Sequence, residues 1–207
     1  ERSANTDDSP QFTDEQRRVL LRLAVDAMAQ TLRTGHRRPP RNADLQPWLR
    51  VPAATFVTLR RGDQLLGCMG TLDPYQSLAS DVVEHSLNAA FDDPRMPAID
   101  WDDFAHMTVE ISVLGPMHPL VVGNRQELLR RLRPHIDGLV VRAGARRATF
   151  LPAVWDSVGS VDDFVALLWR KAGLAPDQWP PTIELFTYRA CAFEAPATAE
   201  GLAGALA

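Results

Sequence analysis

The chain has 207 residues, 45% of them hydrophobic and 23% charged, which is typical of one globular domain or of one domain with a smaller companion. The net charge of −4 excludes the strongly basic surface that nucleic-acid binding requires, and no run approaches the ~18–20 apolar residues of a membrane span. The only cysteines, Cys68 and Cys191, exclude a disulfide framework and favour a reducing cytoplasm.

The first predicted element is a long helix. Residues 1–12 are polar and are expected to form a disordered tail. Thr13 and Gln16 form a capping box, and apolar residues then recur at helical spacing as far as Gly35. The Pro- and Arg-rich stretch 36–50 that follows is predicted as a loop.

The stretch 55–114 predicts a hairpin, a helix and a strand, in that order. Two apolar runs within 55–72 flank a turn at Arg61-Gly62-Asp63. Ser77 is the expected N-cap of the helix, and residues 107–114 alternate between apolar and polar as a strand does.

The same order of elements returns in 137–194, after a short helix near 125–133. Residues 137–151 predict a second hairpin, Ser160 is the expected N-cap of a second helix, and 182–194 is the closing strand. Two such repeats predict an α+β fold, with one largely antiparallel sheet, helices packed against it and a smaller α+β portion.

These elements also bound the predicted domain. It extends over 13–195 and contains a possible internal duplication of 55–114 in 137–194. Residues 196–207 are Ala-rich and are expected to be a second disordered tail.

Cys68 stands between two glycines in the second strand of the first hairpin. The alternation of a strand places Leu66, Cys68 and Gly70 on one face, and Gly67 and Met69 on the other. A glycine in a strand often marks the close approach of another group, so the face beside the thiol is predicted to be open to a ligand.

Two interpretations of this cysteine remain open. The start of the helix at Ser77 favours an anionic thiolate on a nearby Cys68, which would then belong to a functional site. Alternatively, Cys68 is a small buried hydrophobic residue and the glycines serve backbone packing.

His85 and Glu110 are candidates for proton transfer beside Cys68. His85 shares a helix face with apolar residues, so it is either a base that reaches the thiol or a hydrogen-bonded core histidine. Glu110, on the strand 107–114, is a general acid or base with a raised pKa if it shares the face of Cys68. If it faces solvent, it is an ordinary edge charge.

Charged residues follow the first repeat's helix. Asp93 and Arg95 form either a local ion pair or a pair that contacts a ligand. The other histidines show no spacing typical of metal ligands, and no CxxC or HxxxH pattern occurs, so neither a metal site nor a cofactor is expected. These histidines are His36, His106, His118 and His135.

The block "TLRRGDQLLGCMGTLDPYQSLASDVVEHSLNAAFDDPRMP" resembles the signature block of the AMMECR family, whose prokaryotic members are called AmmeMemoRadiSam system protein A. The blocks "VEISVL", "DGLVVR", "ATFLPAVW" and "RKAGL" resemble later family blocks in the same order. The family hallmark Leu-Arg-Gly-Cys-Ile-Gly reads here with Leu66 in place of the arginine, and Trp169 stands where the family often has a cysteine. The family position of His85 more often carries Asn.

The resemblance implies a sheet built from duplicated units with a smaller α+β portion. It also implies an association with a MEMO-like protein and a radical S-adenosylmethionine enzyme.

Two classes of function remain open. One is an enzyme or enzyme subunit that acts on a small molecule or a modified macromolecule, and the other is a non-catalytic adaptor that binds a ligand or a protein. In the first, Cys68 is the reactive or ligand-contacting thiol, assisted by Glu110 or His85. The expected ligand contacts are Gly67, Met69, Gly70, Asp93 and Arg95.

Overall fold

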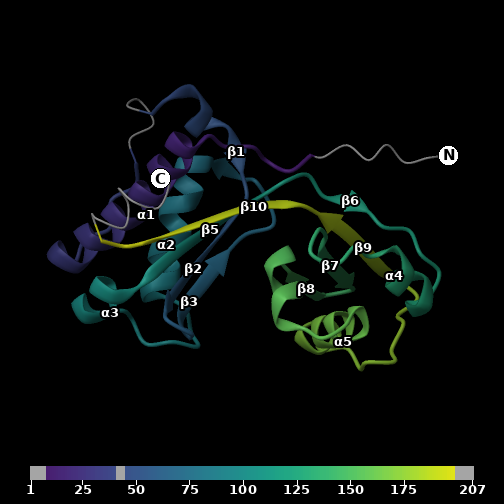
Figure 1. Ribbon diagram of the computed structural model, residues 1–207. Coiled ribbons are helices and arrows are strands. Elements are labelled where there is room, and N and C mark those ends of the chain that lie inside the picture. Colours follow the sequence, from purple (N-terminus) through teal and green to yellow (C-terminus); the bar gives the residue numbers. More distant parts are fainter. Residues whose placement is uncertain (1–7, 41–44, 199–207) are drawn as a thin grey trace. The chain divides into compact units, whose positions relative to one another are not determined.

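The computed structural model describes residues 8–40 and 45–198 (Figure 1). These residues form two compact units, each with its own hydrophobic core. One unit comprises 11–114 with 191–198 and is called the Cys68 unit below. The other comprises 8–10 with 115–190 and is called the second unit.

The long first helix, α1 (Asp14–Thr34), has the predicted ends. Thr13 and Gln16 form the capping box at its start, and Gly35 ends it with a φ of 70°, a conformation that glycine adopts without strain. The predicted loop after it contains one short 3-10 helix, η2 (Pro47–Arg50), and its residues 41–44 lie outside the described part.

The Cys68 unit contains a four-stranded antiparallel sheet in the order β10-β5-β2-β3. Its strands are β2 (Thr55–Arg61), β3 (Gln64–Gly70), β5 (Thr108–Leu114) and β10 (Ala190–Pro196). A separate short pair joins β1 (Pro52–Ala53) to β4 (Gln76–Ser77). Two further helices are α2 (Leu78–Phe91), which begins at the predicted N-cap Ser77, and α3 (Trp101–His106).

Both α1 and α2 pack against the same face of this sheet (Figure 1). The core between them contains Leu20 and Met28 of α1, Val82 of α2, Val57 of β2 and Ile111 of β5, all fully buried. Because side chains alternate along a strand, the residues between these core positions point to the opposite face. That opposite face carries Cys68.

The second unit has a four-stranded antiparallel sheet of its own, in the order β6-β9-β7-β8. Its elements are β6 (His118–Pro119), α4 (Arg125–Arg131), β7 (Gly138–Ala143), β8 (Arg146–Phe150), η3 (Pro152–Ser157), α5 (Val161–Lys171) and β9 (Ile183–Tyr188). In its core, the rings of Trp155 and Phe164 are stacked with centroids 3.7 Å apart. Trp169 is fully buried and donates its indole N–H to the carbonyl of Gln178.

The α+β class and the two hairpin–helix–strand repeats are confirmed. In each repeat the third strand pairs with the first strand of the hairpin, giving β5-β2-β3 in one sheet and β9-β7-β8 in the other. The structure differs from the expectation of one sheet, because each repeat forms a separate sheet. The predicted closing strand 182–194 is correspondingly divided at Arg189 into β9 and β10, which belong to different sheets.

Residues at both predicted tails take part in the fold where the structure describes them. The ring of Phe12 lies 6.3 Å from that of Trp48 and 6.1 Å from that of Phe193. Pro196 ends β10, and the buried Ala197 donates its N–H to the carbonyl of Met107. Residues 1–7 and 199–207 of these tails lie outside the described part.

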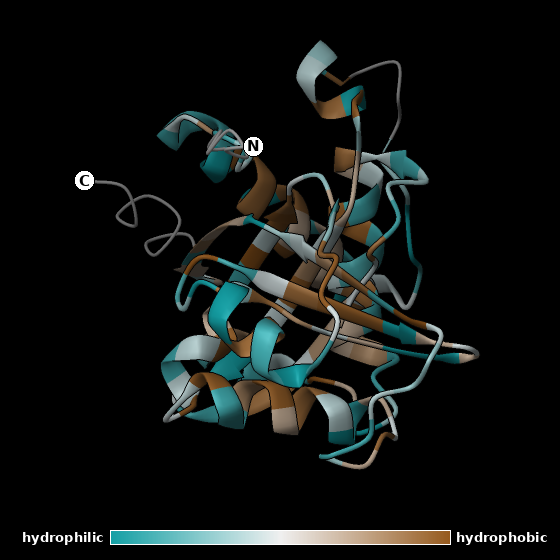
Figure 2. Ribbon diagram, turned by 90° about the vertical axis from the view of Figure 1, so that its right-hand side faces the viewer, coloured by the Kyte–Doolittle hydropathy of each residue, from teal (hydrophilic) through white to brown (hydrophobic). Residues whose placement is uncertain are grey.

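Hydrophilic and hydrophobic residues are mixed along the helices (Figure 2). Within 8–40 and 45–198, none of the helices has both the length and the hydropathy that crossing a membrane requires.

Candidate functional site

The glycines that flank Cys68 are required by close packing. A Cβ on Gly67 would lie 1.9 Å from the carbonyl oxygen of Ala89, so α2 crosses β3 in direct backbone contact at this point. A Cβ on Gly70 would lie 2.4 Å from the ring of Phe56, which is its cross-strand partner. The expectation that Gly70 leaves an open face is therefore wrong, because the Phe56 ring fills that space.

A β-bulge decides which way Cys68 points. Arg60 pairs with Leu65, but the next pair along the hairpin is Leu59 with Gly67, so Leu66 is an extra residue in β3. Leu66 is buried in the core, although simple alternation places it on the face of Cys68. A bulge reverses the alternation beyond it, and so Cys68 points away from α2.

The strand register places three functional groups in one row. Thr58 lies opposite Cys68 of β3 and also opposite Glu110 of β5, so the three side chains share the face turned away from α1 and α2. The hydroxyl of Thr58 donates a hydrogen bond of 3.2 Å to Sγ of Cys68. Thr58 is buried, whereas Cys68 and Glu110 are half-buried.

Burial raises the pKa of the Glu110 carboxyl, and the negative charge of Glu194 on β10 raises it further. Arg60 and a hydrogen bond with Ser112 act in the opposite direction without cancelling these effects. Glu110 thus meets the geometric condition for a proton-transfer group, since it shares the face of Cys68 and holds its proton more tightly than an exposed glutamate.

An ion pair holds the backbone of Cys68 at the free edge of the sheet. The carboxylate of Asp93 accepts the Cys68 N–H at 2.9 Å, and Nη2 of Arg95 donates to the Cys68 carbonyl at 3.0 Å. The same two side chains are joined by Nη2–Oδ2 and Nε–Oδ1 contacts of 2.6 and 2.8 Å. Since β3 is an edge strand, Asp93 and Arg95 supply the acceptor and the donor that a neighbouring strand would provide.

Asp93 is buried, and its hydrogen bond with the Arg95 guanidinium holds the pKa of this carboxyl well below its usual range. Burial opposes this effect, but the backbone N–H groups of Cys68 and Arg95 add to it. Asp93 and Arg95 therefore form the local ion pair that was one of the two interpretations, and this pair fixes the main chain of Cys68. Their contact with a ligand stays a prediction.

The start of α2 lies far from Cys68. The N–H of Leu78 binds the carbonyl of Val51, whereas Ala89, in the last turn of α2, contacts Gly67. At a rise of ~1.5 Å per residue, the helix start is roughly 18 Å further along the axis. The expectation that the helix N-terminus promotes a thiolate at Cys68 is therefore wrong, because the opposite end of α2 adjoins β3.

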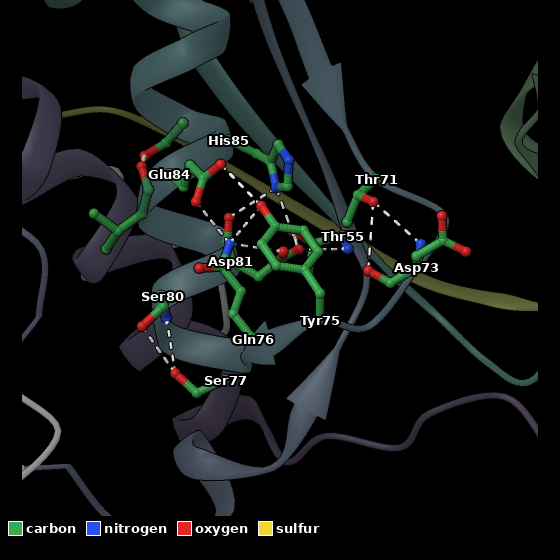
Figure 3. A network of polar contacts seen from close by, with 12 residues as sticks. Thr55, Thr71, Asp73, Tyr75, Gln76, Ser77, Ser80, Asp81, Glu84 and His85 are labelled. Atoms are coloured by element: carbon green, nitrogen blue, oxygen red, sulfur yellow. Dashed lines mark hydrogen bonds and ion pairs between the residues drawn. The ribbon is translucent and has the colours of Figure 1, made fainter.

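His85 belongs to a separate polar network on α2 (Figure 3). Its Nδ1 lies 3.2 Å from Oδ2 of Asp81 and 2.9 Å from the Asp81 carbonyl. Burial lowers the pKa of His85. The hydrogen bond with Asp81 and the negative charge of Asp81 have the larger combined effect, so the pKa of His85 is raised. Within the part of the chain that the structure describes, no hydrogen bond or ion pair joins His85 to Cys68.

The remainder of this network connects α2 to the segment before it. The fully buried Asp81 accepts hydrogen bonds from the N–H and hydroxyl of Thr55 and from the amide of Gln76. The exposed Tyr75 donates its hydroxyl to Glu84 at 2.8 Å, and Gln76 donates to both Tyr75 and Glu84 (Figure 3). Burial and the hydrogen bond to Glu84 raise the pKa of Tyr75 to about 12.

The sequence model of the AMMECR1 family matches residues 21–193. The chain belongs to the AMMECR1 family. It is similar to Protein MK0488 of Methanopyrus kandleri, with 33% identity over 195 residues, 88% of this chain and 90% of that protein. It is also similar to Protein PF1979 of Pyrococcus furiosus, with 35% identity over 177 residues, 80% of this chain and 81% of that protein.

The AMMECR1 fold has also been determined by crystallography. The crystal structure of the uncharacterized protein PH0010 from Pyrococcus horikoshii matches this structure with a TM-score of 0.81 at 31% identity. The match covers 89% of this chain and 93% of that chain. This chain and PH0010 thus share the same fold.

In this AMMECR1 chain, the predicted site residues fall into three groups. Cys68 and Glu110 share the row through Thr58, Asp93 and Arg95 hold the Cys68 backbone, and His85 lies elsewhere on α2. Gly67 and Met69 face the helices, where Met69 packs against the core. Among the described residues, no three His, Cys, Asp or Glu side chains form a group suited to holding a metal ion.

Sequence reasoning missed Thr58, Asp81 and Thr55. Thr58 lies opposite Cys68 only because the bulge shifts the pairing of β2 and β3, and no local sequence pattern predicts that bulge. Asp81 had a signal, because an Asp four residues before a His on one helix face brings the two side chains together.

Proposed function

We propose that this AMMECR1 protein is an enzyme or an enzyme subunit whose reaction site is the row Cys68–Thr58–Glu110. The observation that carries the proposal is the register of β3, β2 and β5, which aligns a thiol, a hydroxyl and a carboxyl of raised pKa on one face. Titratable groups with shifted pKa values that lie beside a nucleophilic side chain are typical of functional sites.

Each group has a distinct role in this proposal. The substrate, a small molecule or a modified macromolecule, lies on the row and its electrophilic atom contacts Sγ of Cys68. Thr58 donates its hydroxyl to the sulfur and so orients the thiol. Glu110 gives or takes the proton that the reaction moves. Asp93 and Arg95 act as positioning residues, because rigid support of the backbone keeps a reactive group in its productive geometry.

The two cysteines provide a matched test of this proposal. Cys191 is half-buried, and burial raises the pKa of its thiol, so its alkylation by iodoacetamide is expected to be slow. The variant Cys191→Ser leaves only the thiol of Cys68, and Cys68→Ser leaves only that of Cys191. We expect the first variant to be alkylated about ten-fold faster than the second at neutral pH. Equal rates, or a slower reaction of Cys68, would contradict a reactive thiol.

A second experiment tests the row independently of thiol reactivity. In the Cys191→Ser background, compounds that protect Cys68 from alkylation are identified from a mixture of cell metabolites. Protection is expected to be lost in Glu110→Gln and kept in Asp63→Gln, a control in the turn of the same hairpin. Protection that survives Glu110→Gln would remove Glu110 from the site.

A non-catalytic module that binds a ligand or a protein is the second candidate. It is favoured by the position of His85, which pairs with Asp81 and leaves the row without a histidine base. A ligand that protects Cys68 and is recovered chemically unchanged after prolonged incubation would favour this candidate over the enzyme.

The pathway and the compartment are also proposals. The family resemblance supports a shared pathway with a MEMO-like protein and a radical S-adenosylmethionine enzyme, and two free thiols suit a reducing cytoplasm. Purification of the tagged full chain from its own cells, followed by mass spectrometry, tests the association. Absence of both proteins from the purified material, with the tagged chain folded, would contradict it.

A further inference from the structure

The carboxylate of Asp81 is buried and accepts three hydrogen bonds from outside its own helix. Its Oδ2 accepts the N–H of Thr55 at 2.8 Å and the hydroxyl of Thr55 at 2.7 Å, while Oδ1 accepts the amide of Gln76 at 3.1 Å. These bonds come from β2 and from the β4 segment, so Asp81 is held from outside its own helix (Figure 3). A buried carboxylate fixed in this way can orient a histidine without moving itself.

The surroundings of His85 determine its tautomer. Nδ1 faces two acceptors, the Asp81 carboxylate at 3.2 Å and the Asp81 carbonyl at 2.9 Å, so Nδ1 carries the proton in the neutral ring. Nε2 then holds a free electron pair. The Nδ1–H binds the Asp81 carbonyl and lies beside the Asp81 carboxylate, which leaves Nε2 as the nitrogen that can accept a proton.

Among the residues that the structure describes, Nε2 of His85 has no hydrogen-bond partner, and yet this atom reaches the surface. The residue is 5% exposed, and within 8–40 and 45–198 its hydrogen bonds all involve Nδ1. Nε2 is not among the fully buried polar atoms without a partner, so this nitrogen accounts for part of the small exposed area. A side chain that is more than nine-tenths buried therefore presents one unpaired nitrogen to the outside.

We propose that His85, positioned by Asp81, is the proton acceptor of a second small-molecule site, separate from the row of Cys68. The ligand carries an O–H or N–H group and no negative charge, because the carboxylates of Asp81 and Glu84 both act on the ring and repel anions. The proton of the ligand passes to Nε2, its bonding electron pair stays on the oxygen or nitrogen of the ligand, and Asp81 stabilises the imidazolium that forms. The row of Cys68 points to the opposite face of the sheet from α2, so the two sites are independent.

The groups that surround His85 agree with this role. The charged groups that act on the ring are Asp81 and Glu84, both on α2, and their charges favour the imidazolium. The β4 segment contributes Tyr75 and Gln76, and β2 contributes Thr55, all of them neutral. Burial lowers the pKa of His85, but the interactions with Asp81 and Glu84 outweigh it and raise the pKa above the ordinary value, which makes the neutral ring a stronger proton acceptor than an unperturbed histidine.

The chain contains a matched control for the experiment. His106 on α3 lies four residues after Asp102, and its Nδ1 approaches the Asp102 carbonyl at 2.8 Å, as His85 approaches Asp81. The side chain of His106 is 58% exposed, whereas that of His85 is 6% exposed. The two histidines therefore share a local pattern and differ in burial and in the support of the carboxylate.

The first measurement uses the wild-type protein and nitrogen-15 NMR of the histidine rings. We expect the neutral ring of His85 to carry its proton on Nδ1 and to titrate with a pKa above the ordinary histidine value of 6.5. A neutral ring protonated on Nε2, or a ring that does not titrate, would overturn the proposal. Assignment of the signals uses His85→Gln, whose fold is checked by circular dichroism.

The second measurement asks whether a small neutral reagent reaches Nε2. Diethyl pyrocarbonate acylates unprotonated histidine nitrogens, and peptide mass spectrometry reports each histidine separately. We expect His85 to react at a rate within about ten-fold of the exposed His106, and Asp81→Asn to shift the pH midpoint of the reaction downward. Complete modification of His106 with no modification of His85 would overturn the proposal, even if Asp81→Asn fails to fold.

Discussion

The substitution Gly67→Ala tests the contact on which the position of Cys68 depends. The added Cβ would lie 1.9 Å from the Ala89 carbonyl oxygen and 2.9 Å from its carbon. A carbon and an oxygen approach each other to about 3.3 Å at the closest, so β3 and α2 must separate by about 1.4 Å. The obstacle is backbone on both sides, and no rotation of a side chain relieves it.

The cost follows from the packing that this separation removes. Overpacking of a core costs about 1–3 kcal/mol, and since two backbones must move here, we expect about 3 kcal/mol. The matched control is Gly62→Ala in the turn of the same hairpin. Gly62 has a φ of 56° with open space around it, so alanine there costs only the strain of the left-handed conformation, about 1 kcal/mol.

Urea unfolding followed by circular dichroism measures both variants. We expect a lower midpoint for Gly67→Ala than for Gly62→Ala, together with faster amide hydrogen exchange in β3 and α2. If Gly67→Ala were as stable as Gly62→Ala or more so, the direct contact between β3 and α2 would be refuted. The glycine would then need another explanation, such as the approach of a ligand.

Three other predictions concern charge and capping. The raised pKa of His85 means that its protonated form stabilises the fold below the ordinary value of 6.5, and this contribution is lost as pH rises through the folded-state pKa. The unfolding free energy of the wild type should therefore fall as the pH rises above ~6.5, and the same fall in His85→Gln would disprove the assignment. The depressed pKa of Asp93 means that its charged form stabilises the fold above the ordinary 3.8 and is lost as pH falls. Asp93→Asn should cost about 3 kcal/mol in urea unfolding at neutral pH and weaken the acid dependence, whereas an unchanged midpoint would argue against the ion pair with Arg95. Ser160 caps α5 through the N–H of Asp163, so Ser160→Ala should cost about 1 kcal/mol and Ser160→Asp almost nothing in the same assay.

Local chemistry made the helices predictable. The capping residues Thr13, Ser77 and Ser160 occupy the N-caps of α1, α2 and α5, because the hydrogen bonds of a cap join residues three apart in sequence. The turns at Gly62 and Gly144 have φ values of 56° and 61°, which local sequence also signals. The short α3 was missed, although Asp100 and Asp103 form its capping box.

Strand partners were not predictable in the same way. Alternation tells which residues of a strand share a face, but the hydrogen bonds of a sheet join residues that are distant in sequence. The sequence of 182–194 therefore predicted one strand. In the structure it forms two strands, of which β9 pairs with β7 and β10 lies beside β5. The expectation of a single sheet failed for the same reason.

The candidate site shows where sequence information ends. The motif around Cys68 identified the family and drew attention to this strand. The sequence also indicated that Glu110 would have a raised pKa if it shared the face of Cys68. The bulge at Leu66 places Cys68 on the face of Glu110. Without the bulge, Cys68 would lie opposite Val57 and face the core.

The sequence by itself determined the α+β class, the helix ends and the family, because these depend on periodicity, capping and short motifs. Only the tertiary structure decided that Asp93 and Arg95 hold the Cys68 backbone and that His85 pairs with Asp81 instead of the thiol. It also decided that α2 presents its last turn, and not its first, to β3. The direction in which a helix crosses a sheet is set by the packing of the whole core, and no short stretch of sequence records it.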